Sequence, residues 1–230
     1  RNKIARVWMD HGIWPLFTLS LYIAQTADLE PLLKETTYFR DSQILRATAI
    51  DYKWDGSDTL KTNLDRPYKG SVLEHIIVQL LAPFFNVGPH NNISLENADW
   101  NDGLDMAADK GESVAFTAFY AYSLYKLCDI LKILQQQKKI DNITLLKEVL
   151  TLVDTPYESI DYNSRAKKLK LLHRYLDSTK DNVANKKHNL PIASLIEDLK
   201  RKADWIVDHI HTQEWINLGK DCGFFNGYYD

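Results

Sequence analysis

Cysteine is scarce in this chain, which has only Cys128 and Cys222 among its 230 residues. Two thiols exclude a disulfide-rich scaffold, and neither lies in a metal-binding or redox motif. Cys128 falls within a helical apolar pattern, so we expect a small buried residue at that position. The scarcity of thiols favours a reducing compartment, and we predict a cytoplasmic location.

Long apolar runs and an excess of basic residues are also missing. No run reaches the roughly 18 residues of a membrane span, and no signal peptide is visible, so we expect no membrane contact. The net charge of −3 and the isoelectric point of about 6.2 argue against nucleic acid as a partner. Lysines gather only at Lys167, Lys168, Lys170, Lys186 and Lys187, and we predict that they cover a solvated helix face.

Several short catalytic motifs are absent as well. The chain holds no Gly-x-Ser-x-Gly, no phosphate loop, no Gly-x-Gly-x-x-Gly and no His-Glu-x-x-His, so no serine nucleophile, nucleotide site or zinc site is indicated. His209 and His211 are two residues apart, which places them on different faces of a helix. His75 lies among apolar residues and is predicted to be an interior histidine. We therefore predict no metal site.

A helical apolar period runs through most of the chain. Hydrophobic residues make up 45% and charged residues 26%, which is enough for a sizeable core in one unit spanning residues 1–230. Ser71 with Glu74, and Thr155 with Glu158, resemble capping boxes. The spacing predicts about seven helices, over residues 15–26, 29–35, 71–83, 112–136, 141–152, 155–178 and 191–211.

The remaining segments lack a sustained period. Residues 51–70, 86–111 and 179–190 are predicted to be loops, and the tail after Trp215 to form turns or a short hairpin. The aromatic stripe between Phe116 and Leu131 is predicted to pack in the core. With almost no strand expected, the chain is assigned to the all-α class.

The loop over residues 86–111 contains the most informative stretch, Asp99-Trp100-Asn101-Asp102-Gly103. A carboxylic acid can protonate a glycosidic oxygen, an indole can stack on a pyranose, and short polar side chains can hold hydroxyls. The same polar residues form ordinary solvated turns, although an indole has no evident role in one.

A calcium loop and a second polar corner are the competing features. An EF-hand spacing begun at Asn97 fails, because Asp102 and Ala108 then stand where glycine and glutamate are required. The corner containing Asp10 and His11 could form the edge of a site or be a turn leading into a helix, and the sequence favours neither.

Asp99-Trp100-Asn101-Asp102-Gly103, followed by Gly111-Glu112-Ser113-Val114 at the head of an aromatic helix, resembles the inverting β-glycoside phosphorylases, which include cellobiose and chitobiose phosphorylases. More of the chain is similar to one branch, 1,2-β-oligoglucan phosphorylase. The supporting stretches are residues 6–15, 38–41, 203–205 and 223–230.

The resemblance implies an (α/α)6 barrel of which this chain is a central slice, since it begins at Arg1 and ends at Asp230. It implies that Asp102 is the general acid and that Trp100 lines the subsite of the transferred sugar. Asp99, Asn101, Asp10 and Glu112 are the other candidate substrate-binding residues. No cofactor is expected, and the co-substrate is inorganic phosphate.

The implied reaction transfers a glucosyl unit from a β-1,2-oligoglucan to phosphate and yields α-glucose 1-phosphate. Asp102 protonates the leaving oxygen, while phosphate attacks the anomeric carbon from the opposite face. An inverting hydrolase would instead need a second carboxylate roughly 6.5–9.5 Å away to activate water, and Asp10 and Glu112 are the candidates.

The sequence is also compatible with the phosphorylase-like domain of a cyclic β-1,2-glucan synthase and with a non-catalytic carbohydrate-binding helical domain. As a slice of a barrel, the chain is expected to be inactive alone. Its exposed barrel edges are expected to favour association, such as a homodimer.

Overall fold

The computed structural model describes residues 7–46, 48–96, 107, 109–157, 159–220 and 222–230. Within these ranges it contains six α-helices and thirteen short strands, so the protein is mixed α/β. The expected all-α class, as a central slice of an (α/α)6 barrel, is wrong. The strands are two to five residues long, too short for an alternating pattern to stand out against the helical period.

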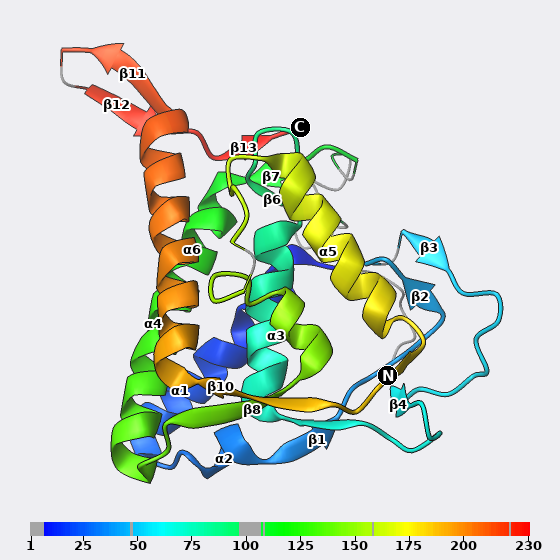
Figure 1. Cartoon of the computed structure of the whole chain (residues 1–230). Helices are drawn as coiled ribbons and strands as arrows, with labels where there is room; N and C mark the ends of the chain where they lie inside the picture. The colour runs from blue at the N-terminus through cyan, green and yellow to red at the C-terminus, as the bar shows by residue number, and fades with distance from the viewer. Residues whose placement is uncertain (1–6, 47, 97–106, 108, 158, 221) are drawn as a thin grey trace.

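Helix α3 (Val72–Phe85) lies in the middle of the molecule, while α4 (Val114–Lys138) and α6 (Ile192–Gln213) run along one side and α5 (Arg165–Thr179) lies on the other (Figure 1). The remaining helical elements are α1 (Trp14–Thr26), α2 (Glu30–Leu33) and the 3-10 segments η1 (Met9–Gly12) and η3 (Lys147–Thr151). Helices α4 and α6 run side by side, and the expected core stripe on α4 is confirmed, with Tyr120, Leu124, Leu127 and Leu131 fully buried.

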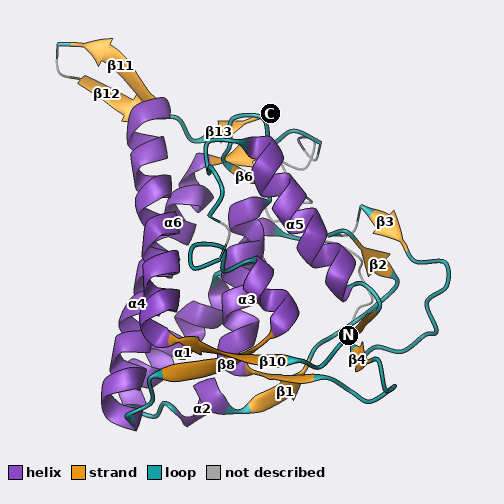
Figure 2. Cartoon of the chain, viewed as in Figure 1, coloured by secondary structure: helices purple, strands orange, loops and turns teal. Residues whose placement is uncertain are grey.

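The strands form small sheets at the edges of this helical body (Figure 2). Five are two-stranded: β1 (Glu35–Thr37) with β5 (Lys69–Ser71), β2 (Gln43–Ile44) with β3 (Ala49–Ile50), β4 (Lys61–Thr62) with β9 (Asn182–Val183), β8 (Asn142–Leu146) with β10 (Lys187–Pro191), and β11 (Trp215–Gly219) with β12 (Cys222–Phe225). The sixth joins β6 (Ile93–Ser94), β7 (Glu112–Ser113) and β13 (Tyr228–Tyr229).

Serine residues cap the N-termini of α3, α4 and α5. The Ser71 hydroxyl accepts a hydrogen bond from the Glu74 amide at 3.1 Å, as the capping box predicted. The Glu74 side chain does not return to the cap. It is buried and accepts from the Tyr38 and Tyr68 hydroxyls, both at 2.9 Å, and from the Leu146 amide at 2.6 Å. One carboxylate thus joins α3 to the sheets at its N-terminal end.

Two of the predicted helices are wrong. The helix predicted over residues 141–152 does not form, and the one predicted over residues 155–178 begins later. Residues 141–152 form β8 and η3, because β8 pairs antiparallel with β10 and alternates Ile143 and Leu145 inward. The Thr155 cap does not begin a helix: the Thr155 amide donates to Asp198 at 3.0 Å, and α5 starts only after Ser164.

The lysine-rich tract is not a uniformly solvated face. Lys168 is fully buried, and its Nζ lies 3.5 Å from the centroid of Trp205 and 4.5 Å from that of Phe84. Burial, and then repulsion from Lys202, lower the pKa of Lys168 well below its ordinary value. The prediction for this lysine is therefore wrong, whereas Lys167 is exposed as expected.

The tail forms the short hairpin that was one of the two expectations for it. Strands β11 and β12 pair antiparallel and project from the end of α6 (Figure 1). None of the described helices has the length and apolar character needed to cross a membrane.

Candidate functional site

The Asp99-Trp100-Asn101-Asp102 block lies outside the described residues. The structure describes the chain up to Glu96 on one side and from Ala107 and Asp109 on the other. The geometry of the site is therefore built from the residues that hold these two flanks and from the two other candidates, Asp10 and Glu112.

Glu96 is held by three hydrogen bonds. Arg46 donates to its carboxylate from Nε at 2.8 Å and from Nη2 at 3.0 Å, and the Asn86 amide donates at 2.5 Å. The backbone of Glu96 is left-handed, with φ of 57°, which costs a non-glycine residue about 1–2 kcal/mol. A bidentate pair with little solvent exposure on either side chain can offset that cost.

The Asp10 corner lies beside the same flank. Trp8 forms a β-bridge with Glu96, and η1 begins at the next residue, Met9. Asp10 accepts a hydrogen bond from the Trp14 indole at 2.8 Å through Oδ2. Its other oxygen, Oδ1, is buried and has no partner among the described residues. The corner thus places an underused carboxylate oxygen next to the flank of the candidate segment.

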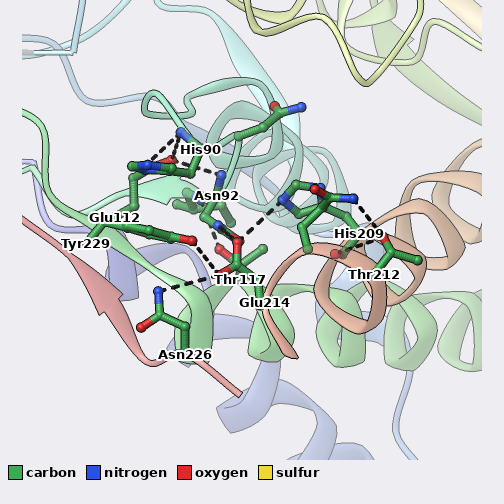
Figure 3. A network of polar contacts seen from close by, with 12 residues as sticks. His90, Asn92, Glu112, Thr117, His209, Thr212, Glu214, Asn226 and Tyr229 are labelled. Carbon is green, nitrogen blue, oxygen red and sulfur yellow. Dashed lines mark hydrogen bonds and ion pairs between the residues drawn. The ribbon is translucent and has the colours of Figure 1, made fainter. Parts of the chain in front are cut away.

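Glu112 lies on the other flank, in β7, and is fully buried. Its carboxylate accepts from the His90 amide at 3.0 and 3.1 Å and from the Asn92 amide at 3.0 Å. The Nδ1 atom of His90 lies 2.7 Å from Oε2 (Figure 3). Both oxygens of Glu112 therefore hold the turn that leads into β6.

The packing of this turn against Glu112 requires a glycine at position 88. A Cβ on Gly88 would lie 2.4 Å from Cγ of Glu112, so any larger residue there would displace the buried carboxylate. The Gly88 amide donates to the Asn92 carbonyl at 3.0 Å, and Asn91 takes a left-handed conformation with φ of 67°. The backbone thereby aims the amides of His90 and Asn92 at Glu112.

A second buried carboxylate, Glu214 at the end of α6, continues this network. It accepts from the Asn92 side-chain amide at 2.6 Å and from the Tyr229 hydroxyl at 2.9 Å. The Tyr229 ring stacks on His90 with centroids 3.6 Å apart. Two carboxylates thus link the turn before β6, strand β7, the end of α6 and the C-terminal strand β13 (Figure 3).

His209 borders the network on α6. Its Nε2 lies 3.8 Å from Glu214, too far for a hydrogen bond, and its ring stacks on Trp205 at 4.9 Å. Burial first, and then the nearby charge of Lys168, lower the pKa of His209. The imidazole therefore favours its neutral form, so Glu214 is bound by neutral donors.

Sequence reasoning identified Glu112 as a candidate but missed its partners His90, Asn92, Glu214 and Tyr229. The glycine and asparagines of residues 86–92 were a signal for a tight turn. The pairing of Asn92 with Glu214 spans 122 positions, and no local pattern encodes it.

A comparison with protein families bears on this region. Residues 53–164 match the catalytic domain of the glycosyl hydrolase 94 superfamily. The match covers just under half of the chain and includes the Asp99–Asp102 block, Glu96 and Glu112. It supports the resemblance to β-glycoside phosphorylases at the level of the superfamily. No curated protein matches the chain.

Proposed function

We propose that this chain carries the general acid of an active site that cleaves β-1,2-linked gluco-oligosaccharides with phosphate. The carrying observation is the glycosyl hydrolase 94 match, which contains the Asp-Trp-Asn-Asp-Gly block. The hydrogen bonds that hold the part-buried Glu96 and the buried Glu112 support it, because fixed flanks help to position catalytic side chains.

In this proposal, Asp102 is the general acid. Its proton moves to the glycosidic oxygen as the bond from that oxygen to the anomeric carbon breaks. An oxygen of phosphate forms the new bond from the opposite face, which gives α-glucose 1-phosphate and a shortened oligosaccharide. Phosphate is already an anionic nucleophile, so a second carboxylate to activate water is not needed.

The other candidates take supporting roles. Trp100 stacks on the transferred sugar, while Asp99 and Asn101 hold its hydroxyls. Asp10 offers a buried oxygen without a partner among the described residues, which suits a sugar hydroxyl. For Glu112 we propose a positioning role, because His90 and Asn92 already occupy its carboxylate.

The test measures phosphate-dependent release of α-glucose 1-phosphate from β-1,2-oligoglucans by the full protein that carries this sequence. Asp102→Asn removes the proton donor, and general acid catalysis typically contributes about 10²–10⁴-fold, so we expect a loss of that size in kcat/KM. Asp99→Asn is the matched control, a neighbouring carboxylate for which we expect a smaller loss.

A substrate with a good leaving group should partly rescue Asp102→Asn, because such a group departs without a proton. Equal losses in the two variants, or no rescue, would contradict the role of Asp102. Release of free glucose without phosphate would favour an inverting hydrolase.

Three further expectations stay predictions: that the 230 residues alone are inactive, that they associate with one another, and that the protein is cytoplasmic.

A further inference from the structure

A cavity of about 430 Å³, lined by apolar and polar side chains together, lies between the C-terminal half of α5 and the segment that leads into β2. Its volume falls within the range of about 300–1,000 Å³ that is usual for small-molecule sites. The lining that matters here comes from Phe39, Arg40, Asp41, Gln43 and Arg46, opposite Lys180 on the α5 side.

The cavity adjoins the flank of the candidate active-site segment. Arg46 lines the cavity and also donates both hydrogen bonds of its bidentate pair to Glu96. Glu96 directly precedes residues 97–106, which contain Asp102. A ligand in this cavity therefore contacts the residue, Arg46, that holds Glu96 in place.

The charges of the lining argue against a bound anion. Arg40 pairs with Asp51 at 3.2 Å, Arg46 with Glu96, and Lys180 with Asp177 at 3.1 Å. Each of the three cations thus already faces a carboxylate. A phosphate group is best held by cations that are free to give charge-assisted hydrogen bonds, and the carboxylate of Asp41 also lines the cavity.

The same lining suits a neutral polyhydroxylated ligand. Sugar hydroxyls both donate and accept, and the cavity offers both functions. Nε of Arg40 is a buried donor without a partner among the described residues. Asp41 accepts a hydrogen bond from the backbone N–H of Gln43 through Oδ1 at 2.8 Å, which leaves Oδ2 as an acceptor. The Gln43 side chain supplies a donor and an acceptor together.

An aromatic ring completes this arrangement. Phe39 lines the cavity while 47% exposed. A half-exposed ring beside hydrogen-bonding groups is the combination that accommodates the apolar face and the hydroxyl edge of a pyranose.

From this geometry we infer that the cavity lined by Phe39, Asp41 and Gln43 is an additional sugar subsite, which binds a glucosyl unit of the oligosaccharide away from the bond that is cleaved. The inference rests on the proposed function for the identity of the sugar, and on the cavity alone for its location.

The test is equilibrium binding by calorimetry, with the 230-residue chain, β-1,2-glucotriose and no phosphate. Phe39→Ala removes the ring and Gln43→Leu removes the amide at similar size. We expect each to raise the Kd about tenfold, since a change of that size corresponds to about 1.4 kcal/mol. Tyr52→Ala is the control, because Tyr52 is also aromatic, is 92% exposed and does not line the cavity.

Wild-type affinity in both test variants, with unchanged thermal unfolding, overturns the subsite. So does the absence of binding by the wild-type chain, or displacement of the trisaccharide from this cavity when inorganic phosphate is added in a second, competitive titration. The subsite and the reaction fail separately. Binding that depends on Phe39 without phosphorolysis by the full protein removes the reaction alone, whereas phosphorolysis that needs Asp102 but not Phe39 or Gln43 removes the subsite alone.

Discussion

At the scale of single residues, Lys168 is the least expected feature. Its ammonium group could gain up to about 2 kcal/mol from the Trp205 ring when desolvated, yet its pKa is lowered. Burial therefore outweighs the aromatic contact. Lys168→Met keeps the length and removes the amine, and we expect the free energy of unfolding at pH 7 to rise by about 1–3 kcal/mol. Denaturant titration measures this change.

The lowered pKa also fixes the sign of a pH effect. The unfolded chain keeps the Lys168 proton up to about pH 10.5, whereas the folded chain releases it at lower pH, so the unfolded state binds more protons in between. Wild-type stability should gain from this residue as the pH rises toward 10.5, and Lys168→Met should lack that gain. Lys167→Met removes the neighbouring exposed lysine and should change stability by about 0.5 kcal/mol or less. An equal effect of both variants would contradict the buried amine.

Residue-level inference from sequence worked where the local pattern decides burial. Cys128 lies in the core as its apolar surroundings predicted, and burial raises the pKa of its thiol to about 11. It failed for Lys168, since a basic residue in a polar stretch gives no sign that Trp205, 37 positions later, covers it. His75 was intermediate: it is half-buried and stacks on Tyr38 at 3.6 Å.

At the scale of elements, the two predicted capping boxes had different outcomes. Ser71 caps α3 as expected, because nothing else competes for its hydroxyl among the described residues. At Thr155 the neighbouring Asp154 forms a buried ion pair with Lys202 at 2.6 Å and accepts from the Tyr162 hydroxyl at 2.8 Å. These tertiary bonds hold the segment after Asp154 against the core, and α5 begins only after Ser164. The local sequence contains the cap motif, but it does not show that Lys202 and Tyr162 bind the neighbouring Asp154.

These two sites give a matched prediction. Ser71→Ala should lower the free energy of unfolding by about 1 kcal/mol, the usual cost of a lost N-cap. Thr155→Ala should cost about 0.5 kcal/mol or less, because the Thr155 hydroxyl makes only contacts of 3.5 Å. Urea unfolding of both variants checks this, and a larger loss at Thr155 would mean that its hydroxyl stabilises the turn more than these distances indicate.

At the scale of the whole molecule, the sequence predicted a largely helical structure but not the short strands that pair distant segments of the chain. The all-α assignment counted helices from periodicity, the (α/α)6 barrel followed from the family resemblance, and neither included the short strands that connect distant segments. The sheet of β6, β7 and β13 brings residues near 93, 112 and 228 together; Glu112 belongs to it, and Tyr229 of β13 donates to Glu214. Long-range pairing of two residues at a time leaves no periodic signal.

Tyr229 tests whether this junction acts as one unit. Tyr229→Ala removes the stack on His90 and the hydrogen bond to Glu214, together worth about 2–4 kcal/mol. Amide hydrogen exchange at His90 and Asn92 should then accelerate about tenfold for each 1.4 kcal/mol lost, while exchange at Leu127 in the α4–α6 core stays unchanged. Tyr228→Ala is the control, because Tyr228 is the adjacent, exposed residue of the same strand. If both variants accelerate exchange equally, strand pairing alone holds the junction. If neither does, the turn held by Glu112 is independent of the C-terminal strand.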